Sequence, residues 1–211
     1  MLTDRTGAGR ELAEKLAKEP VDAPVILALA RGGVPVALPI ARALNAPLDL
    51  AFVRKLPMPG QPELAAGAVV ESGAREVVFN TGLLAEAGLE QAYFTRAVAA
   101  AGAEIARQRA AILGDRVPLH LSGRTVIVVD DGIATGASIR AVLQAVRRRG
   151  PVEVWLAVPV APQEMLWQLR GWVDRLVFLE APRTFHAISQ HYACFAQISD
   201  REVRTLMVPG G

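Results

Sequence analysis

Two adjacent carboxylates followed by a loop of small residues are the part of the sequence best suited to chemistry. Asp130 and Asp131 come directly after the apolar run at residues 126–129. Ligands of open parallel sheets bind beyond the carboxyl ends of the strands, where these acids would stand. Paired carboxylates are good acceptors for neighbouring hydroxyl groups, such as the vicinal hydroxyls of a ribose. The pair therefore predicts a diol-binding site at a sheet edge.

The residues after the acids are suited to a phosphate group. They are small or carry hydroxyls, and they lead into a helical pattern. Backbone N–H groups at a helix N-terminus attract anions, since they are unpaired and the helix dipole adds about half a positive charge. The candidate phosphate-binding residues are Gly132, Ile133, Ala134, Thr135, Gly136, Ala137 and Ser138.

Each half of this pattern also has an ordinary structural interpretation. Aspartates often begin turns, and Thr135 or Ser138 can simply cap the next helix. For either half alone that interpretation is favoured. The two halves joined in this order, with small residues wherever a phosphate must approach, favour the functional one.

Residues 126–138 resemble the motif of type I phosphoribosyltransferases that binds 5-phosphoribosyl 1-pyrophosphate (PRPP): four hydrophobic residues, two acids and a small-residue loop with Thr-Gly. The resemblance implies that Asp130 and Asp131 hold the ribose hydroxyls and that residues 134–138 hold the 5-phosphate. Ala134 stands where hypoxanthine-guanine enzymes carry an aspartate. Adenine and orotate enzymes also lack that acid, so the acceptor stays open.

Two basic segments could complete the site. Arg31, Gly32 and Gly33 follow the first predicted strand and resemble the family's pyrophosphate loop, although Arg-Gly-Gly is also a common turn with a solvated arginine. Arg54 and Lys55 follow the second predicted strand and could bring two cations to a departing pyrophosphate. Their alternative is a pair of exposed charges beside a loop.

Several other polar or aromatic residues are weaker candidates. Glu63 could act as a general base, but an exposed loop glutamate is more often solvated, so it is not assigned a catalytic role. His186, Tyr192 and Phe195 are predicted either to line a hood over the acceptor or to pack in the core. The three histidines have no metal-site spacing, and Cys194 is the single cysteine. No protein-bound metal is expected.

The resemblance implies transfer of the 5-phosphoribosyl group from PRPP to a nitrogen acceptor such as a nucleobase, with release of pyrophosphate. Mg²⁺ would arrive with PRPP, and the catalytic residues would be Arg54, Lys55, Asp130 and Asp131. Relatives are commonly dimers, so a homodimer is expected. The alternative is a regulatory protein that binds PRPP without transferring it. A nucleotide hydrolase is disfavoured because the chain has no Gly-x-x-x-x-Gly-Lys-[Ser/Thr] loop.

The elements that must position these residues alternate between strands and helices. Strands are expected at residues 25–30, 48–53, 126–129, 152–158 and 173–179, and helices at 9–18, 34–44, 83–113, 136–149, 163–170 and from Ser199. This alternation predicts an α/β fold with a Rossmann-like open parallel sheet flanked by helices. A hairpin is expected at residues 67–79. The Pro- and Gly-rich residues 54–67 are expected to form a mobile loop over the site.

Composition bounds the remaining possibilities. With 211 residues, 52% hydrophobic and 21% charged, the chain can bury a full core. A single domain over residues 1–211 is expected, with a core at about 25–180 and a small hood from 1–24 and 181–211. The net charge of +2 is small and the basic residues are scattered, so no nucleic acid is expected as a partner. The polar start and the lack of a long apolar run predict a cytoplasmic protein that does not meet a membrane.

Overall fold

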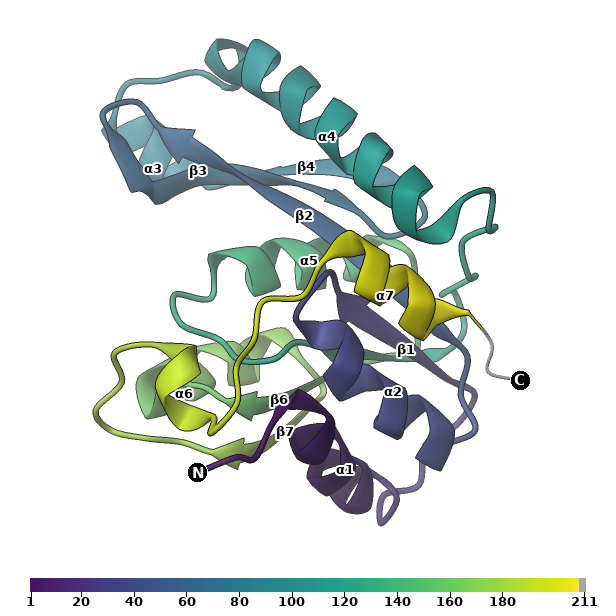
Figure 1. Ribbon diagram of the computed structural model, residues 1–211. Coiled ribbons are helices and arrows are strands. Elements are labelled where there is room, and N and C mark those ends of the chain that lie inside the picture. The colour runs from purple at the N-terminus through teal and green to yellow at the C-terminus, as the bar shows by residue number, and fades with distance from the viewer. Residues whose placement is uncertain (209–211) are drawn as a thin grey trace.

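The computed structural model describes residues 1–208 and contains one mixed, mostly parallel seven-stranded sheet (Figure 1). The strand order is β4-β3-β2-β1-β5-β6-β7. The neighbours β2, β1, β5, β6 and β7 run parallel, whereas β3 and β4 extend the β2 edge as antiparallel strands. The predicted α/β class is confirmed. The strands are β1 (Pro24–Leu29), β2 (Leu48–Met58), β3 (Gln61–Glu71), β4 (Arg75–Phe79), β5 (Thr125–Val129), β6 (Glu153–Val160) and β7 (Arg175–Glu180).

Helices cover both faces of this sheet. The helices α1, α2, α4 and α7 contribute buried side chains to one face, and α5 and α6 contribute to the other. The α-helices are α1 (Arg5–Leu16), α2 (Gly33–Ala43), α3 (Thr81–Glu86), α4 (Thr95–Leu113), α5 (Ala137–Arg148), α6 (Gln163–Leu169) and α7 (Asp200–Met207). Three short 3-10 turns lie at Gln91–Phe94, Arg170–Trp172 and Ile188–His191. None of the described helices is long and apolar enough to cross a membrane.

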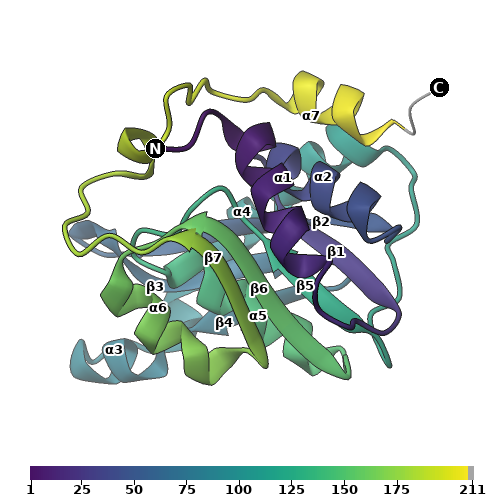
Figure 2. The same cartoon turned by 90° about the horizontal axis from the view of Figure 1, so that it is seen from below.

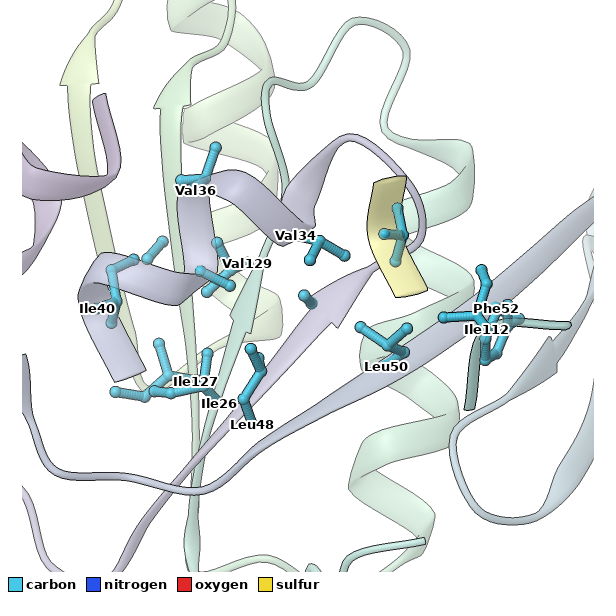
Figure 3. Close-up of a cluster of buried hydrophobic side chains, with 14 of the residues drawn as sticks. Ile26, Val34, Val36, Ile40, Leu48, Leu50, Phe52, Ile112, Ile127 and Val129 are labelled. Carbon is cyan, nitrogen blue, oxygen red and sulfur yellow. The ribbon is translucent and has the colours of Figure 1, made fainter. Parts of the chain in front are cut away.

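The central strands read as continuous apolar runs because both of their faces are covered. Successive side chains of a strand point to opposite faces, so Ile26 packs with the α2 side while Val25 and Leu27 pack with the α5 side. Figure 3 shows the first cluster, in which Ile26 and Ile127 lie beneath Ile40 of α2. This packing fixes where β1 and β5 end, and so where the candidate site residues stand.

The prediction that residues 54–67 lack regular structure is wrong. β2 continues to Met58, β3 begins at Gln61, and the two pair as a hairpin closed by Pro59 and Gly60. Gly60 has a φ of +72°, a left-handed conformation that glycine adopts without a steric penalty. Pro57 is accommodated because the strand register shifts on both sides of it. The expected hairpin at residues 67–79 is confirmed as the pairing of β3 with β4.

The N-terminal segment lies beside the chain that connects β7 to α7 (Figure 2). Leu2 forms an isolated parallel bridge with Tyr192, and its N–H donates to the carbonyl oxygen of His191 at 2.9 Å. The first helix starts at Arg5 rather than near Gly9, because Asp4 caps it by accepting a hydrogen bond from Gly7 N–H at 2.7 Å. The final helix from Ser199 is confirmed and has a capping box with Glu202. Residues 209–211 of the expected hood lie outside the described residues.

Candidate functional site

The turn after β1 and the turn after β5 lie next to each other because these strands are parallel neighbours, with Ala28 opposite Val129. This places Gly32 and Gly33 directly against the acids. A Cβ at Gly32 would overlap the Oδ2 atom of Asp131, and one at Gly33 would lie 2.5 Å from the carbonyl oxygen of Val129. Both positions therefore require glycine for close backbone approach. The Ala30–Arg31 peptide that precedes them is cis.

The loop between β5 and α5 carries a row of unpaired amides. Among residues 1–208, no acceptor takes a hydrogen bond from the backbone N–H groups of residues 134–138. Ile133 differs, since its side chain is buried and its N–H donates to the carbonyl oxygen of Val160 at 3.0 Å. Ile133 thus anchors the loop and cannot offer its N–H to a ligand. Gly136 has a φ of +74° immediately before α5, which turns the loop into the helix.

These amides border a small cavity of about 210 Å³. Besides residues 130–139, its lining includes Lys55 from β2 and Ile188 from the segment after β7. The lining of the cavity therefore combines two carboxylates, a row of backbone amides and the side chain of Lys55. That arrangement can accept a phosphorylated sugar, with the hydroxyls toward the acids and the phosphate toward the amides.

A larger cavity of about 530 Å³ meets the first at Asp130, Asp131 and Ser138. Arg54 lines this larger cavity, whereas Lys55 lines the smaller one. Adjacent residues of a strand point to opposite faces, and the two cations accordingly border different cavities.

Three guanidinium groups line the larger cavity, and each has an acidic partner. Arg31 lies 3.6 Å from the carboxylate of Asp200, and Arg54 lies 3.7 Å from that of Glu104. Gln108 connects the two, because it accepts a hydrogen bond from Arg54 at 2.7 Å and donates one to Asp200 at 2.9 Å. The turn after β1, strand β2 and helices α4 and α7 thus meet in one polar network.

The third guanidinium belongs to Arg5 at the start of α1. Its Nε donates to Oδ2 of Asp131 at 2.7 Å, and its Nη1 donates to the carbonyl oxygen of Ala196 at 2.7 Å. The side chains of Arg5 and Asp131 are only 11% and 12% exposed. Sequence reasoning missed Arg5, Glu104, Gln108 and Asp200 because they lie far from the motifs and no local pattern marks them.

The electrostatics of the acid pair follow from this enclosure. Burial raises the pKa of Asp130 well above its usual value, and the neighbouring Asp131 charge raises it further, while the Arg5 charge opposes the shift. Tyr192 donates its hydroxyl hydrogen to the main-chain oxygen of Asp131 at 2.6 Å. Burial raises the pKa of this phenol above its usual value, so it stays a donor at neutral pH.

Of the weaker candidates from the sequence, one lines a cavity and the others do not. Phe195 lines the larger cavity and lies flat against the Arg5 guanidinium, 3.7 Å from ring centre to Cζ. Tyr192 is a core residue, and His186 is exposed. Glu63 is exposed on β3 and lines neither cavity. Within residues 1–208, no group of three or more His, Cys, Asp or Glu side chains is arranged to hold a metal ion.

The fold and the sheet-edge site place the molecule among α/β proteins with a mostly parallel sheet and an open carboxyl edge. The model of the phosphoribosyl transferase domain matches residues 2–189, so the chain belongs to the phosphoribosyl transferase family.

Known relatives agree with this assignment. Provisionally named phosphoribosyl transferases of two Mycobacterium tuberculosis strains, CDC 1551 and H37Rv, are 42% identical over 203 residues, covering 96% of this chain. The chain spans 45% of the length of these relatives. The crystal structure of TT1426 from Thermus thermophilus superimposes with a TM-score of 0.86 at 39% identity, covering 99% of this chain and 98% of that one.

Proposed function

We propose that the protein transfers the 5-phosphoribosyl group of PRPP to a nitrogen acceptor and releases pyrophosphate. The observation that carries the proposal is the row of unpaired amides at residues 134–138 immediately after the half-buried and buried carboxylates of Asp130 and Asp131. A phosphate monoester and a vicinal diol are the two groups that one sugar phosphate would present to these donors and acceptors.

The small cavity is the proposed 5-phosphate site. Its amides supply hydrogen bonds at the N-terminus of α5, and Thr135 and Ser138 add hydroxyl donors. Lys55 adds a positive charge from β2. We therefore assign Lys55 to the 5-phosphate, in place of the pyrophosphate role that its position beside Arg54 had suggested.

The larger cavity is the proposed site of the pyrophosphate and the acceptor. Arg31, Arg54 and the amide of Gly32 would face the pyrophosphate, whose release requires its growing negative charge to be stabilised. Gly33 is buried beneath this wall, against the carbonyl oxygen of Val129. This leaving group would receive Lewis-acid stabilisation from the Mg²⁺ that accompanies PRPP. The carboxylates and open cavity fit an ion that arrives with its own oxygen ligands, and no protein side chain is assigned as its direct ligand.

The C-terminal segment provides the remaining wall. Phe195, Gln197 and Ile198 line the larger cavity and give it an aromatic edge, an amide and an apolar surface. A planar, nitrogen-containing acceptor suits this combination, because ring faces stack and amides pair with ring nitrogens and carbonyls. Arg54 and Lys55, on the β2 strand of the β2–β3 hairpin, line the two cavities. We propose that this hairpin excludes water, which would otherwise intercept the reacting sugar carbon.

A pyrophosphate-release assay with PRPP, Mg²⁺ and a panel of purines, pyrimidines and other amines tests the proposal. Release that depends on one acceptor supports the transferase. Tight PRPP binding with no release for any acceptor favours the regulatory alternative. If calorimetry detects no PRPP binding at all, both assignments of the site are wrong.

A further inference from the structure

We propose that Arg5 is a positioning residue, which holds Asp131 in an orientation that lets its second carboxylate oxygen accept a ribose hydroxyl. The inference rests on the proposed function, since it concerns the same diol site. It assigns a role to the N-terminal helix, which lies outside every motif of the sequence. Arg5 touches Asp131 and not the reacting atoms, so it is not a catalytic residue.

The contacts of Arg5 fix its guanidinium in one place. Nε binds one oxygen of Asp131, Nη1 binds the carbonyl oxygen of Ala196, and the flat face rests on the ring of Phe195. These contacts come from two separate parts of the fold, the turn after β5 and the segment that precedes α7. They hold the guanidinium at the wall of the cavity, and its bond to Asp131 uses Oδ2 alone, which leaves Oδ1 for a ligand.

The helix that carries Arg5 is itself held in a defined position. Gly9 of α1 packs so closely on α2 that a Cβ there would overlap the backbone of Val36. Ahead of the helix, the carbonyl oxygens of Leu2 and Thr3 accept hydrogen bonds from Ala193 N–H at 2.8 Å and Cys194 N–H at 3.0 Å. The start of α1 is thus fixed on both sides, and Arg5 with it.

Asp131 needs such a partner because of its surroundings. Its carboxylate is nearly buried, lies beside a second carboxylate, and has the backbone of Gly32 against Oδ2. The other charged or titratable groups that border the pair are Lys55, Arg31, Arg54 and Tyr192. Arg31 and Arg54 are paired with Asp200 and Glu104. Within residues 1–208, Arg5 is the cation that is hydrogen-bonded to the Asp130–Asp131 pair. A buried carboxylate that loses its cation becomes strongly unfavourable in its ionised form.

The test compares Arg5→Met and Arg5→Gln, which remove the charge, with Arg5→Lys, which keeps it. Arg10→Met is the matched control, because Arg10 is exposed on the same helix. Calorimetry with Mg²⁺ and PRPP over the acidic to neutral range is the measurement. We expect about tenfold or greater loss of affinity in both uncharged variants, from the loss of a charge-assisted hydrogen bond. The pH below which PRPP affinity falls should rise by about one unit in both uncharged variants. Arg5→Lys should recover part of both effects, and Arg10→Met should match the unchanged protein.

Two results would overturn the inference. Tighter PRPP binding in Arg5→Met would mean that Arg5 obstructs the diol site. Weaker binding with an unmoved pH profile in Arg5→Gln would mean that Arg5 only anchors the helix. If Arg5→Met does not fold, Arg5→Gln and Arg5→Lys still decide between these outcomes, since both can keep the hydrogen bond to Ala196.

A second measurement separates this inference from the proposed function. Carbon-13 carboxyl NMR of the ligand-free protein follows the ionisation of the Asp130–Asp131 pair without PRPP. The pair should lose its second proton at a higher pH in Arg5→Gln than in the unchanged protein, and an equal pH would contradict the role of Arg5. If the unchanged protein binds no PRPP, the proposed function fails, while this titration still reports whether Arg5 sets the ionisation of the pair.

Discussion

The two halves of the site are built in different ways. The half proposed to bind phosphate is one continuous segment, residues 130–138, which runs from the end of β5 to the start of α5. Its amides at 134–138 are unpaired within residues 1–208. The other half is assembled from four separate elements: Arg54, Gln108 and Asp200 form one hydrogen-bonded network, and Arg5 binds Asp131. The first half depends on local backbone geometry. The second exists only when distant elements pack together, so the two should respond differently to mutation.

The largest effect is expected from a change in the local half. Gly136→Ala adds a Cβ to a residue with a φ of +74°, where it would lie 2.5 Å from the sulfur of Met165. The loop must then rearrange, and ribose 5-phosphate affinity should fall about 100-fold, the loss of roughly two hydrogen bonds to a charged phosphate. Gly150→Ala is the control, since its φ is +68° and the nearest atom lies 3.5 Å away. It should cost about 1–2 kcal/mol of stability from the left-handed backbone and leave affinity unchanged. Equal affinities in the two variants would contradict the phosphate assignment.

Asp131 belongs to both halves, so its replacement tests where they join. Asp131→Asn exchanges an ionised acceptor for an amide, and we expect PRPP binding to weaken by about 1–3 kcal/mol. Isothermal titration calorimetry is the measurement. Asp174→Asn, at an ion pair with Arg147 on the far end of the sheet, serves as the control. An unchanged binding constant in Asp131→Asn would remove the acid from the proposed diol site.

Replacing Arg54 and Lys55 of β2 one at a time should affect the two halves of the site separately. Lys55→Ala should weaken ribose 5-phosphate binding about tenfold, and Arg54→Ala should weaken pyrophosphate binding by a similar factor, since each loses one charged contact. The opposite ligand should be little affected in each variant, because the two side chains border different cavities. Fluorescence or calorimetric titration with each ligand decides the matter. If both variants lose pyrophosphate alone, the two cations act together despite their opposite directions.

The smallest effect is expected on stability, and it has the opposite sign from the effects on binding. The pKa of Asp130 is raised in the folded protein, so at neutral pH the folded state is penalised relative to the unfolded state. The penalty appears as pH rises above the unfolded value of about 3.9 and is complete above the folded pKa. Asp130→Asn should therefore raise the Tm at neutral pH and leave it nearly unchanged at strongly acidic pH. A lower Tm at neutral pH would show that the carboxylate stabilises the fold.

Prediction from sequence succeeded where local pattern decides structure. The apolar runs at residues 25–30 and 126–129, the turn glycines and the acid pair each predicted their own element. The strands then had to be parallel neighbours for the two turns to meet. The Pro- and Gly-rich residues 54–67 gave a wrong prediction of an irregular loop, because proline and glycine are common in loops. Here Pro59 and Gly60 form the turn of a regular hairpin, and the register shift around Pro57 leaves it in the strand.

The sequence by itself determined the α/β class and the small-residue loop that follows the two acids, since each depends on residues within a few positions of one another. Only the tertiary structure decided that Lys55 and Arg54 border different cavities, that Asp200 and Gln108 reach the site, and that Arg5 binds Asp131 across 126 positions. Hydrogen bonds and ion pairs depend on distances of a few ångströms. Such distances between remote residues are set by helix and strand packing, which no local pattern records.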